Sequence, residues 1–359
     1  MGKFSGIARL LCVFAVCLAL IIYNFCGRIF DDVSAGTNAF AASSETDSSV
    51  SRENNTESGG KEENESFGSV SSADKDESSQ TDQSSSEASA PAAAPENVKG
   101  KIISNYISPY KAGLSYNNVY LKNGTEHTID IKSLLTAPLS FKVEKSDSPQ
   151  VLIMHTHTTE TFMTEDTEYY TDAFTSRTRD KTKNMVSVGE IVAKKLNDAG
   201  IKTIHDTTEH DYPKYSGSYT RAAETILGYL EKYPSIKIVL DLHRDAASSG
   251  NDKVKLVTEI DGKKAAQVML VMGSQSEGGS GYPNWRENLK LAVRLQQMIE
   301  VKYPTLARPL SLTTGQYNQS LTKGSLLIEF GTDANTVAEA HYSAQMVGDA
   351  LVSLLNTLT

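Results

Sequence analysis

The chain has 359 residues, enough for two domains of ordinary size, with a formal net charge of −9 and three cysteines. A negative chain has no electrostatic basis for binding nucleic acid, so that class of partner is excluded. The cysteines are Cys12, Cys17 and Cys26, which excludes a thiolate metal site or a disulfide framework in the rest of the chain.

The N-terminal region predicts a membrane anchor. Residues 10–23 are uninterrupted apolar, and with its flanks the run reaches about 20 residues, the length that spans a bilayer. Lys3 and Arg9 precede it, which predicts a cytoplasmic N-terminus and the remainder of the chain outside the cytoplasm. A cleaved signal peptide is the alternative, since Ala39-Phe-Ala41 resembles a cleavage site. That site lies far beyond the apolar run, so we expect a retained single-pass anchor within residues 1–30.

Residues 42–98 predict a disordered linker. They are rich in Ser, Glu, Asp, Asn and Ala, with Phe67 as the only aromatic residue, and cannot bury enough apolar surface to fold. A flexible coil of about 57 residues has an end-to-end distance of about 40 Å. A binding role for this acidic run is the alternative, but the composition favours a solvated tether that carries most of the net negative charge.

Residues 99–150 predict a small β-rich lead-in. Short alternating runs occur at 117–121, 127–131 and 139–143, separated by turn signals such as Asn123-Gly124.

Residues 151–359 predict an α/β catalytic domain. Apolar runs predict strands at 151–154, 201–204, 236–242 and 326–330, and helical periodicity predicts helices near 186–196, 219–233, 287–303 and 335–355. A hairpin joins 254–260 to 265–272 through Asp261-Gly262. This alternation predicts a mostly parallel twisted sheet with helices on both faces. The polar segment 156–183 is long for a connection, which is typical of a functional loop.

Polar side chains follow three of the apolar strands. His155, His157 and Glu160 follow the first, His243 follows the third, and Glu329 interrupts the last. The carboxyl edge of such a sheet is where ligands bind, and two imidazoles with a carboxylate form a catalytic zinc site. One histidine at a strand end is more often a hydrogen-bonded core residue than a ligand, but three such groups at two strand ends favour a metal. A charge inside an apolar strand needs either a cation or a raised pKa, as a general base near a metal has.

Four segments together resemble the stage II sporulation protein P family, from about residue 151 to the C-terminus. They are His155-Thr-His-Thr-Thr-Glu160, Asp241-Leu-His-Arg-Asp-Ala246, Gly315-Gln-Tyr-Asn-Gln319, and Leu326-Leu-Ile-Glu-Phe-Gly331 followed by Asn335-Thr336. The resemblance implies an amidase-3-like fold and a zinc-dependent N-acetylmuramoyl-L-alanine amidase. It further implies endopeptidase activity on cross-linked stem peptides, acting during engulfment in endospore formation.

The resemblance also implies roles for individual residues. His157 and His243 match the ligand histidines, and Glu329 matches the catalytic glutamate. The amidase-3 pattern places its ligand glutamate at the start of the next helix, where this chain has no acid. Glu160 is therefore our expected third ligand, with Glu190 as a fallback.

Two further residues have more than one expected role. His155 is either a rival to His157 or a group that supports the ligands from behind. Arg244 either binds a carboxylate or a glycan oxygen of the substrate, or forms an ion pair with Asp241 or Asp245.

Partners and location follow from the same resemblance. It implies peptidoglycan as substrate, stage II sporulation proteins D and M as partners, and the mother-cell engulfing membrane as the site of action, with the catalytic domain facing the intermembrane space. A different class of function remains open, a non-catalytic peptidoglycan-binding scaffold that recruits other hydrolases. Glu329 favours the enzyme, because a binding module has no need for an ionisable group inside an apolar strand.

Overall fold

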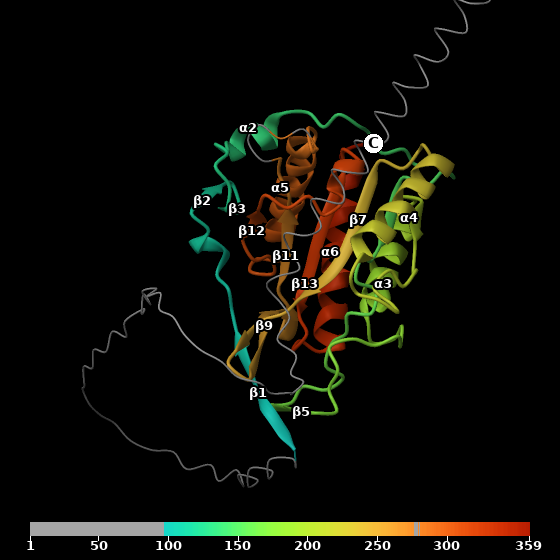
Figure 1. Cartoon of the computed structure of the whole chain (residues 1–359). Coiled ribbons are helices and arrows are strands. Elements are labelled where there is room, and N and C mark those ends of the chain that lie inside the picture. Colours follow the sequence, from blue (N-terminus) through green and yellow to red (C-terminus); the bar gives the residue numbers. More distant parts are fainter. Residues whose placement is uncertain (1–96, 276–278, 280) are drawn as a thin grey trace, which may run out of the picture.

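The computed structural model describes residues 97–275, 279 and 281–359 (Figure 1). The expected anchor and almost all of the expected linker lie outside these residues. Within the part that the structure describes, no helix is both long and apolar enough to cross a membrane.

The main sheet has eight strands in the order β2-β3-β12-β11-β13-β7-β4-β6. Its strands are β2 (Leu114–Tyr116), β3 (Val119–Asn123), β4 (Val151–Met154), β6 (Thr203–His205), β7 (Ile238–Asp245), β11 (Val268–Met272), β12 (Leu310–Leu312) and β13 (Ser325–Thr332). The strands β13, β7, β4 and β6 are parallel to one another, as are β11, β12 and β3. The two blocks run in opposite directions, because β11 pairs with β13 antiparallel.

A smaller sheet lies beside the main one, in the order β10-β9-β1-β5 (Figure 1). It contains β1 (Val98–Asn105), β5 (Tyr169–Thr171), β9 (Asp252–Ile260) and β10 (Lys263–Ala266), and the short β8 (Ser248–Ser249) pairs with β9. Through this sheet, β5 from the long loop after β4 pairs with β1, the first strand of the described chain.

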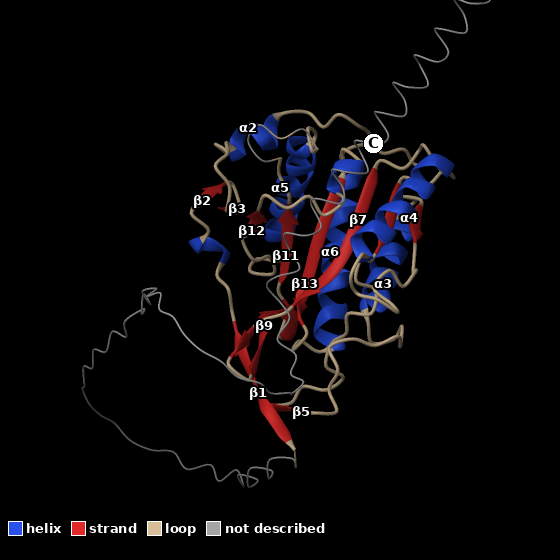
Figure 2. Ribbon diagram, viewed as in Figure 1, coloured by secondary structure: helices blue, strands red, loops and turns tan. Residues whose placement is uncertain are grey.

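The long helices run alongside the main sheet (Figure 2). They are α3 (Met185–Asp198), α4 (Ser218–Lys232), α5 (Trp285–Lys302) and α6 (Val337–Asn356), with the short α2 (Ile131–Thr136) packed on α5. Side chains alternate along a strand, so each strand contributes to both faces of the sheet. Leu240 and Leu242 of β7 belong to the large core formed with α3, α5 and α6. Val239 packs instead in the smaller core under α4.

Local sequence explains where the helices begin and end. Asn184 caps α3 by accepting the amide of Val186, and Thr336 forms a capping box with Glu339 at the start of α6. After α3, Gly200 adopts a left-handed φ of 78°, which lets the chain turn back into the sheet.

The mixed α/β architecture is confirmed, with two local corrections in the lead-in. The strand expected at 127–131 is wrong, because Asp130 accepts the Ser133 amide and hydroxyl and so caps α2 instead. No strand forms at 139–143. The strands of segment 99–150 pair with later parts of the chain, β1 with β9 and β3 with β12.

The second strand of the expected hairpin also differs from the prediction. The run 265–272 divides at Gln267, so that β10 pairs with β9 while β11 joins the main sheet. The side chain of Gln267 bonds the backbone of Ile107, and so its two polar groups are satisfied at the junction between the sheets.

Candidate functional site

The candidate site lies at the carboxyl ends of three adjacent parallel strands, β4, β7 and β13. Asp241 and His243 occupy alternate positions of β7 on the same face as Val239, toward α4. Glu329 of β13 is in register with His243. The sheet therefore brings these three side chains to one face, which was expected for His243 and Glu329 from their positions at strand ends.

His243 lies between two carboxylates. Glu160 Oε2 is 3.6 Å from its Nδ1, and Asp241 Oδ1 is 2.8 Å from its Nε2. The Asp241 oxygen lies off the direction of the ring N–H, so Nε2 is buried without a hydrogen-bond partner. Burial favours the neutral ring, but Asp241 and Glu160 outweigh it and raise the pKa of His243 well above its ordinary value. The imidazole thus supplies a positive charge between the two carboxylates.

His157 extends from the loop after β4 toward α4. Its Nδ1 lies 3.4 Å from the Ser218 hydroxyl, and its Nε2 lies 3.2 Å from the Tyr215 hydroxyl. The ring centroids of His157 and His243 are 5.2 Å apart. Burial lowers the pKa of His157 to about 4, so that the ring is neutral at pH 7.

Glu160 is buried and ionised. Burial alone would raise its pKa, but Arg244 and His243 together hold the pKa well below its usual range. Its Oε2 accepts the backbone N–H of Arg244 at 3.2 Å, and its Oε1 is 3.9 Å from Arg177.

Glu329, in contrast to Glu160, favours the neutral, protonated form. Burial raises its pKa to about 8, and its Oε2 is buried with no hydrogen-bond partner among the described residues. A carboxyl group of this kind holds a proton near neutral pH and exchanges it readily, which is the property of a general base or acid.

The donor chemistry of this cluster suits a metal ion. It offers a neutral imidazole, an ionised carboxylate and a second imidazole whose Nε2 lacks a hydrogen bond, the donor types of a catalytic zinc site. Across the described ranges, however, no three His, Cys, Asp or Glu side chains stand in an arrangement ready to hold an ion. The side chains stand in a hydrogen-bonded arrangement instead, with the Tyr215 hydroxyl at the His157 Nε2 position.

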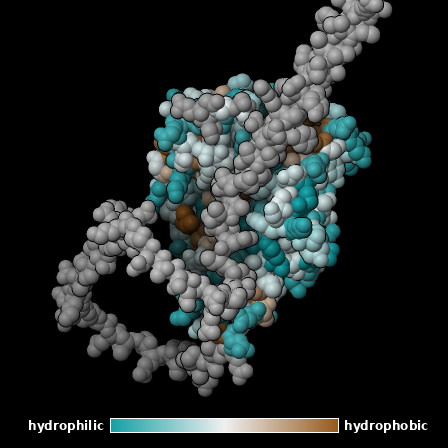
Figure 3. Space-filling view, viewed as in Figure 1, coloured by the Kyte–Doolittle hydropathy of each residue, from teal (hydrophilic) through white to brown (hydrophobic). Residues whose placement is uncertain are grey.

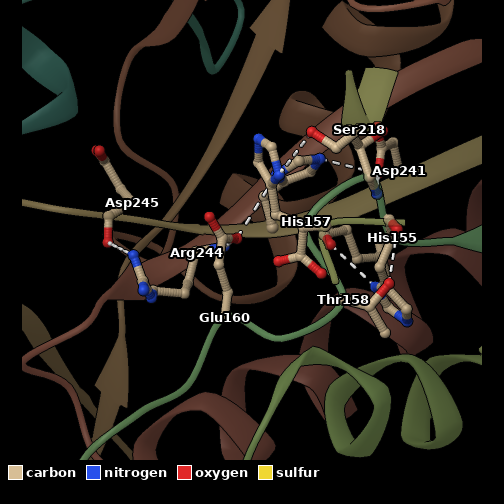
Figure 4. A network of polar contacts seen from close by, with 12 residues as sticks. His155, His157, Thr158, Glu160, Ser218, Asp241, Arg244 and Asp245 are labelled. Carbon is tan, nitrogen blue, oxygen red and sulfur yellow. Dashed lines mark hydrogen bonds and ion pairs between the residues drawn. The ribbon is translucent and has the colours of Figure 1, made fainter. Parts of the chain in front are cut away.

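The two residues considered as alternative ligands, His155 and Glu190, lie away from the cluster around His243. His155 points away from His157, toward α3 (Figure 4). Its Nδ1 bonds the Leu242 carbonyl at 2.9 Å, and its Nε2 lies 2.9 Å from the ring of His205. Glu190 is exposed on α3 and contacts His205 at 3.3 Å. The structure therefore does not bring His155 or Glu190 to the cluster around His243, although His155 supports the backbone beside it.

The Arg244 guanidinium donates hydrogen bonds to backbone carbonyls. Its Nε donates to Thr161 O at 3.0 Å and its Nη2 to Ser176 O at 2.6 Å. Both acceptors belong to the long loop after β4, so Arg244 fixes that loop over the site. The expected ion-pair partner Asp245 pairs instead with Arg308, at 2.9 Å.

Sequence reasoning missed two contributors. Asp241 is held by the backbone N–H and the hydroxyl of Thr156, at 2.8 and 2.7 Å, and faces His243. An acid within the apolar run 236–242 gives the same signal as Glu329 and could have been found in the same way. Tyr215 comes from a polar segment with no periodicity, and nothing in the sequence marks it.

Fold and site together define an α/β protein with an imidazole–carboxylate centre at the ends of parallel strands. A family model described as Stage II sporulation protein P matches residues 25–352, nearly the whole chain. The chain therefore belongs to the stage II sporulation protein P family, which confirms the resemblance.

A curated relative supports this membership. The chain is 28% identical over 219 residues to Stage II sporulation protein P of Bacillus subtilis (strain 168). That alignment covers 58% of the chain and 51% of the relative, so the chain matches about half the length of the curated relative.

Two amidases are among the solved structures that the chain matches. N-acetylmuramoyl-L-alanine amidase AmiC2 of Nostoc punctiforme is 12% identical, with a TM-score of 0.34 over 60% of this chain and 97% of that one. The CwlD amidase of Clostridioides difficile, in complex with the GerS lipoprotein, is 9% identical, with a TM-score of 0.36 over 58% and 99%.

Proposed function

We propose that the chain is a zinc-dependent peptidoglycan hydrolase that cleaves the N-acetylmuramoyl-L-alanine amide, and stem-peptide cross-links as well, during engulfment in endospore formation. One observation carries the proposal. Glu329 Oε2 is buried without a hydrogen-bond partner, and His243 Nε2 beside it is buried with only a misaligned contact to Asp241 at 2.8 Å. Buried polar atoms without partners are costly, so their retention supports a role with an ion or a substrate.

The ligand set of this proposal is His157, Glu160 and His243. Zinc would polarise the amide carbonyl and lower the pKa of a water molecule toward about 7. The carboxylates around His243 support this assignment, because they raise its pKa and so favour a positive charge at this position. A divalent cation would take over that charge.

Glu329 is the proton carrier of the proposal. Its Oε2 would take a proton from the attacking water and pass it to the amine of the leaving L-alanine. Burial raises the Glu329 pKa to about 8, so the carboxyl group holds a proton readily once it has taken one. A divalent cation bound by the ligand set would lower this pKa and give the ionised carboxylate that the first step requires. Asp241 would keep the orientation of His243, because Thr156 fixes both of its oxygens.

The proposal extends to location and partners. Residues 10–23 would anchor the protein as a single-pass membrane protein, and residues 42–98 would tether the catalytic domain to the outer face of the engulfing membrane. Peptidoglycan is the substrate in this proposal, and stage II sporulation proteins D and M are the partners that the family membership suggests.

The test uses the full-length chain in detergent with purified peptidoglycan. Zinc per chain, thermal melting and released muropeptides are measured for the wild type and for Glu329→Gln. We expect about one zinc in both proteins, equal melting, and a fall in turnover of about two to four orders of magnitude in the variant.

Each other outcome has a distinct meaning. A wild type that binds peptidoglycan but holds no zinc and releases no muropeptides would be a scaffold. Near-normal release by Glu329→Gln would exclude this residue as the base. Loss of zinc from Glu329→Gln would make it a ligand instead.

A further inference from the structure

The segment between β6 and α4 presents one tyrosine to the candidate site from a fixed backbone. Arg221 of α4 donates to the carbonyls of His210 and Ser216, at 2.6 and 3.2 Å, on either side of Tyr215. The Asp211 carboxylate accepts the Thr159 hydroxyl at 2.6 Å and so joins this segment to the loop after β4. The backbone is thus anchored on two sides, whereas the Tyr215 side chain remains 46% exposed.

The ring of Tyr215 contacts both a cation and an imidazole. The Arg177 guanidinium is 4.5 Å from its centroid, and the His157 ring stacks on it at 4.6 Å with an angle of 18°. Arg177 is itself fixed by Asp211 at 2.5 Å. These contacts fix the plane of the phenol and hold its hydroxyl close to Nε2 of His157.

The Tyr215 hydroxyl lies beside a ring nitrogen of His157, one of the proposed ligands. It lies 3.2 Å from His157 Nε2, while Ser218 lies 3.4 Å from Nδ1 of the same ring. A neutral imidazole has one donor nitrogen and one acceptor nitrogen. Because the rings of Tyr215 and His157 are stacked, the Tyr215 hydroxyl lies over Nε2 and not along the in-plane lone pair that a ligand nitrogen offers to a metal. The Tyr215 O–H would therefore lie beside a metal held at Nε2 without blocking it.

We propose that Tyr215 is a catalytic residue whose hydroxyl donates a hydrogen bond to the carbonyl oxygen of the scissile amide as that oxygen gains negative charge. This inference rests on the proposed hydrolase function. A fixed donor directed at developing charge contributes about 10²- to 10³-fold to turnover, because it needs no reorganisation during the reaction. The arrangement is specific to Tyr215, because Tyr219 meets His157 edge-on at 5.6 Å and has no contact with Arg177 of this kind.

The test compares Tyr215→Phe with Tyr212→Phe in the full-length, zinc-supplemented protein. Tyr212 is a matched control, since it is 48% exposed in the same segment and its ring also lies under an arginine, Arg179, at 4.3 Å. Phenylalanine keeps the ring stack and removes only the hydroxyl. We expect Tyr215→Phe to lower kcat about 10²- to 10³-fold with unchanged KM and zinc content, and Tyr212→Phe to match the wild type.

A second readout does not depend on turnover. A phosphonamidate analogue of the muramyl-L-alanine amide carries tetrahedral, negatively charged oxygens, so Tyr215→Phe should weaken its binding by a factor similar to the loss in kcat. An unchanged kcat and unchanged analogue affinity would overturn the inference. A fall in zinc content or a rise in KM that accounts for the whole effect would overturn it too, because the hydroxyl would then only support His157. Hydrolysis by the wild type and by Tyr212→Phe tests the proposed function separately, and its absence would overturn both.

Discussion

The two faces of the main sheet use the same strands for different purposes. Toward α3, α5 and α6, the central strands present apolar side chains such as Leu240 and Ile328. Toward α4, the same strands present Asp241, His243 and Glu329 near their carboxyl ends. Because successive side chains of a β-strand point to opposite faces, one set of residues packs in the core while the alternate set forms the candidate site. The part of the surface that is coloured in Figure 3 is mostly hydrophilic, with small hydrophobic patches.

The largest expected effect tests the pair His155 and His157, which lie on opposite sides of this division. His157→Ala should remove most zinc and nearly all hydrolysis, a loss beyond the roughly 10- to 100-fold that removal of an outer group causes. His155→Ala should retain zinc and lose stability by about 1–3 kcal/mol, because the Leu242 carbonyl loses its partner. Zinc content and urea denaturation measure both effects. Loss of zinc from His155→Ala but not from His157→Ala would reverse our choice of His157 as the ligand.

A second prediction compares neighbours on β13. Ile328 is fully buried in the large core, so Ile328→Ala should lower the free energy of unfolding by about 2–5 kcal/mol. Turnover well below the melting temperature should stay close to that of the wild type, since the side chain faces away from His243. Denaturant midpoints and muropeptide release are the measurements. If activity falls by more than the fraction of protein that is unfolded, the core face and the site face of the sheet are coupled.

The last prediction concerns the pH dependence of stability in the chelator-treated protein. Burial raises the pKa of Glu329 from 4.5 to about 8, so the folded state binds this proton more tightly than the unfolded state. The resulting stability is fully present below pH 4.5 and is lost as the pH rises through 8. In Glu329→Gln this component should disappear, which flattens the decline between pH 5 and 8. Urea midpoints of both chelator-treated proteins measure the difference, and parallel curves would contradict the shift. His243 contributes with the same sign in both proteins, so it cancels in the comparison.

Periodicity located most of the regular elements, because long apolar patterns have one stable arrangement. The helices α3 to α6 and the strands β4, β7 and β13 follow from such patterns, and the meeting of His243 with Glu329 follows from parallel strand ends. Short elements without a pattern of their own, such as β5 and β12, were not predicted. Each forms only because a distant strand offers backbone hydrogen bonds, β1 to the first and β11 to the second.

The remaining parts of the site depend on side-chain contacts between distant segments. The direction of His155 depends on the Leu242 carbonyl and on His205, and the position of Tyr215 depends on Arg177 and Arg221. Spacing along the chain places residues at a strand end but does not say which way each side chain turns there. For this reason the sequence indicated a zinc-type cluster and left the choice between His155 and His157 open.

The pairing of β1 has a mechanical consequence. β1 is the first strand of the described chain, and it pairs with β9 on one side and with β5 of the site loop on the other. Any tension transmitted through the residues before 97 enters the fold at this strand. A load along a strand acts on all its ladder hydrogen bonds together, so β1 would carry force in shear while remaining attached to the loop that holds Glu160 and Arg177. Pulling the folded chain from its N-terminus in an optical trap, with hydrolysis monitored under load, would measure how far a force on β1 alters the proposed activity.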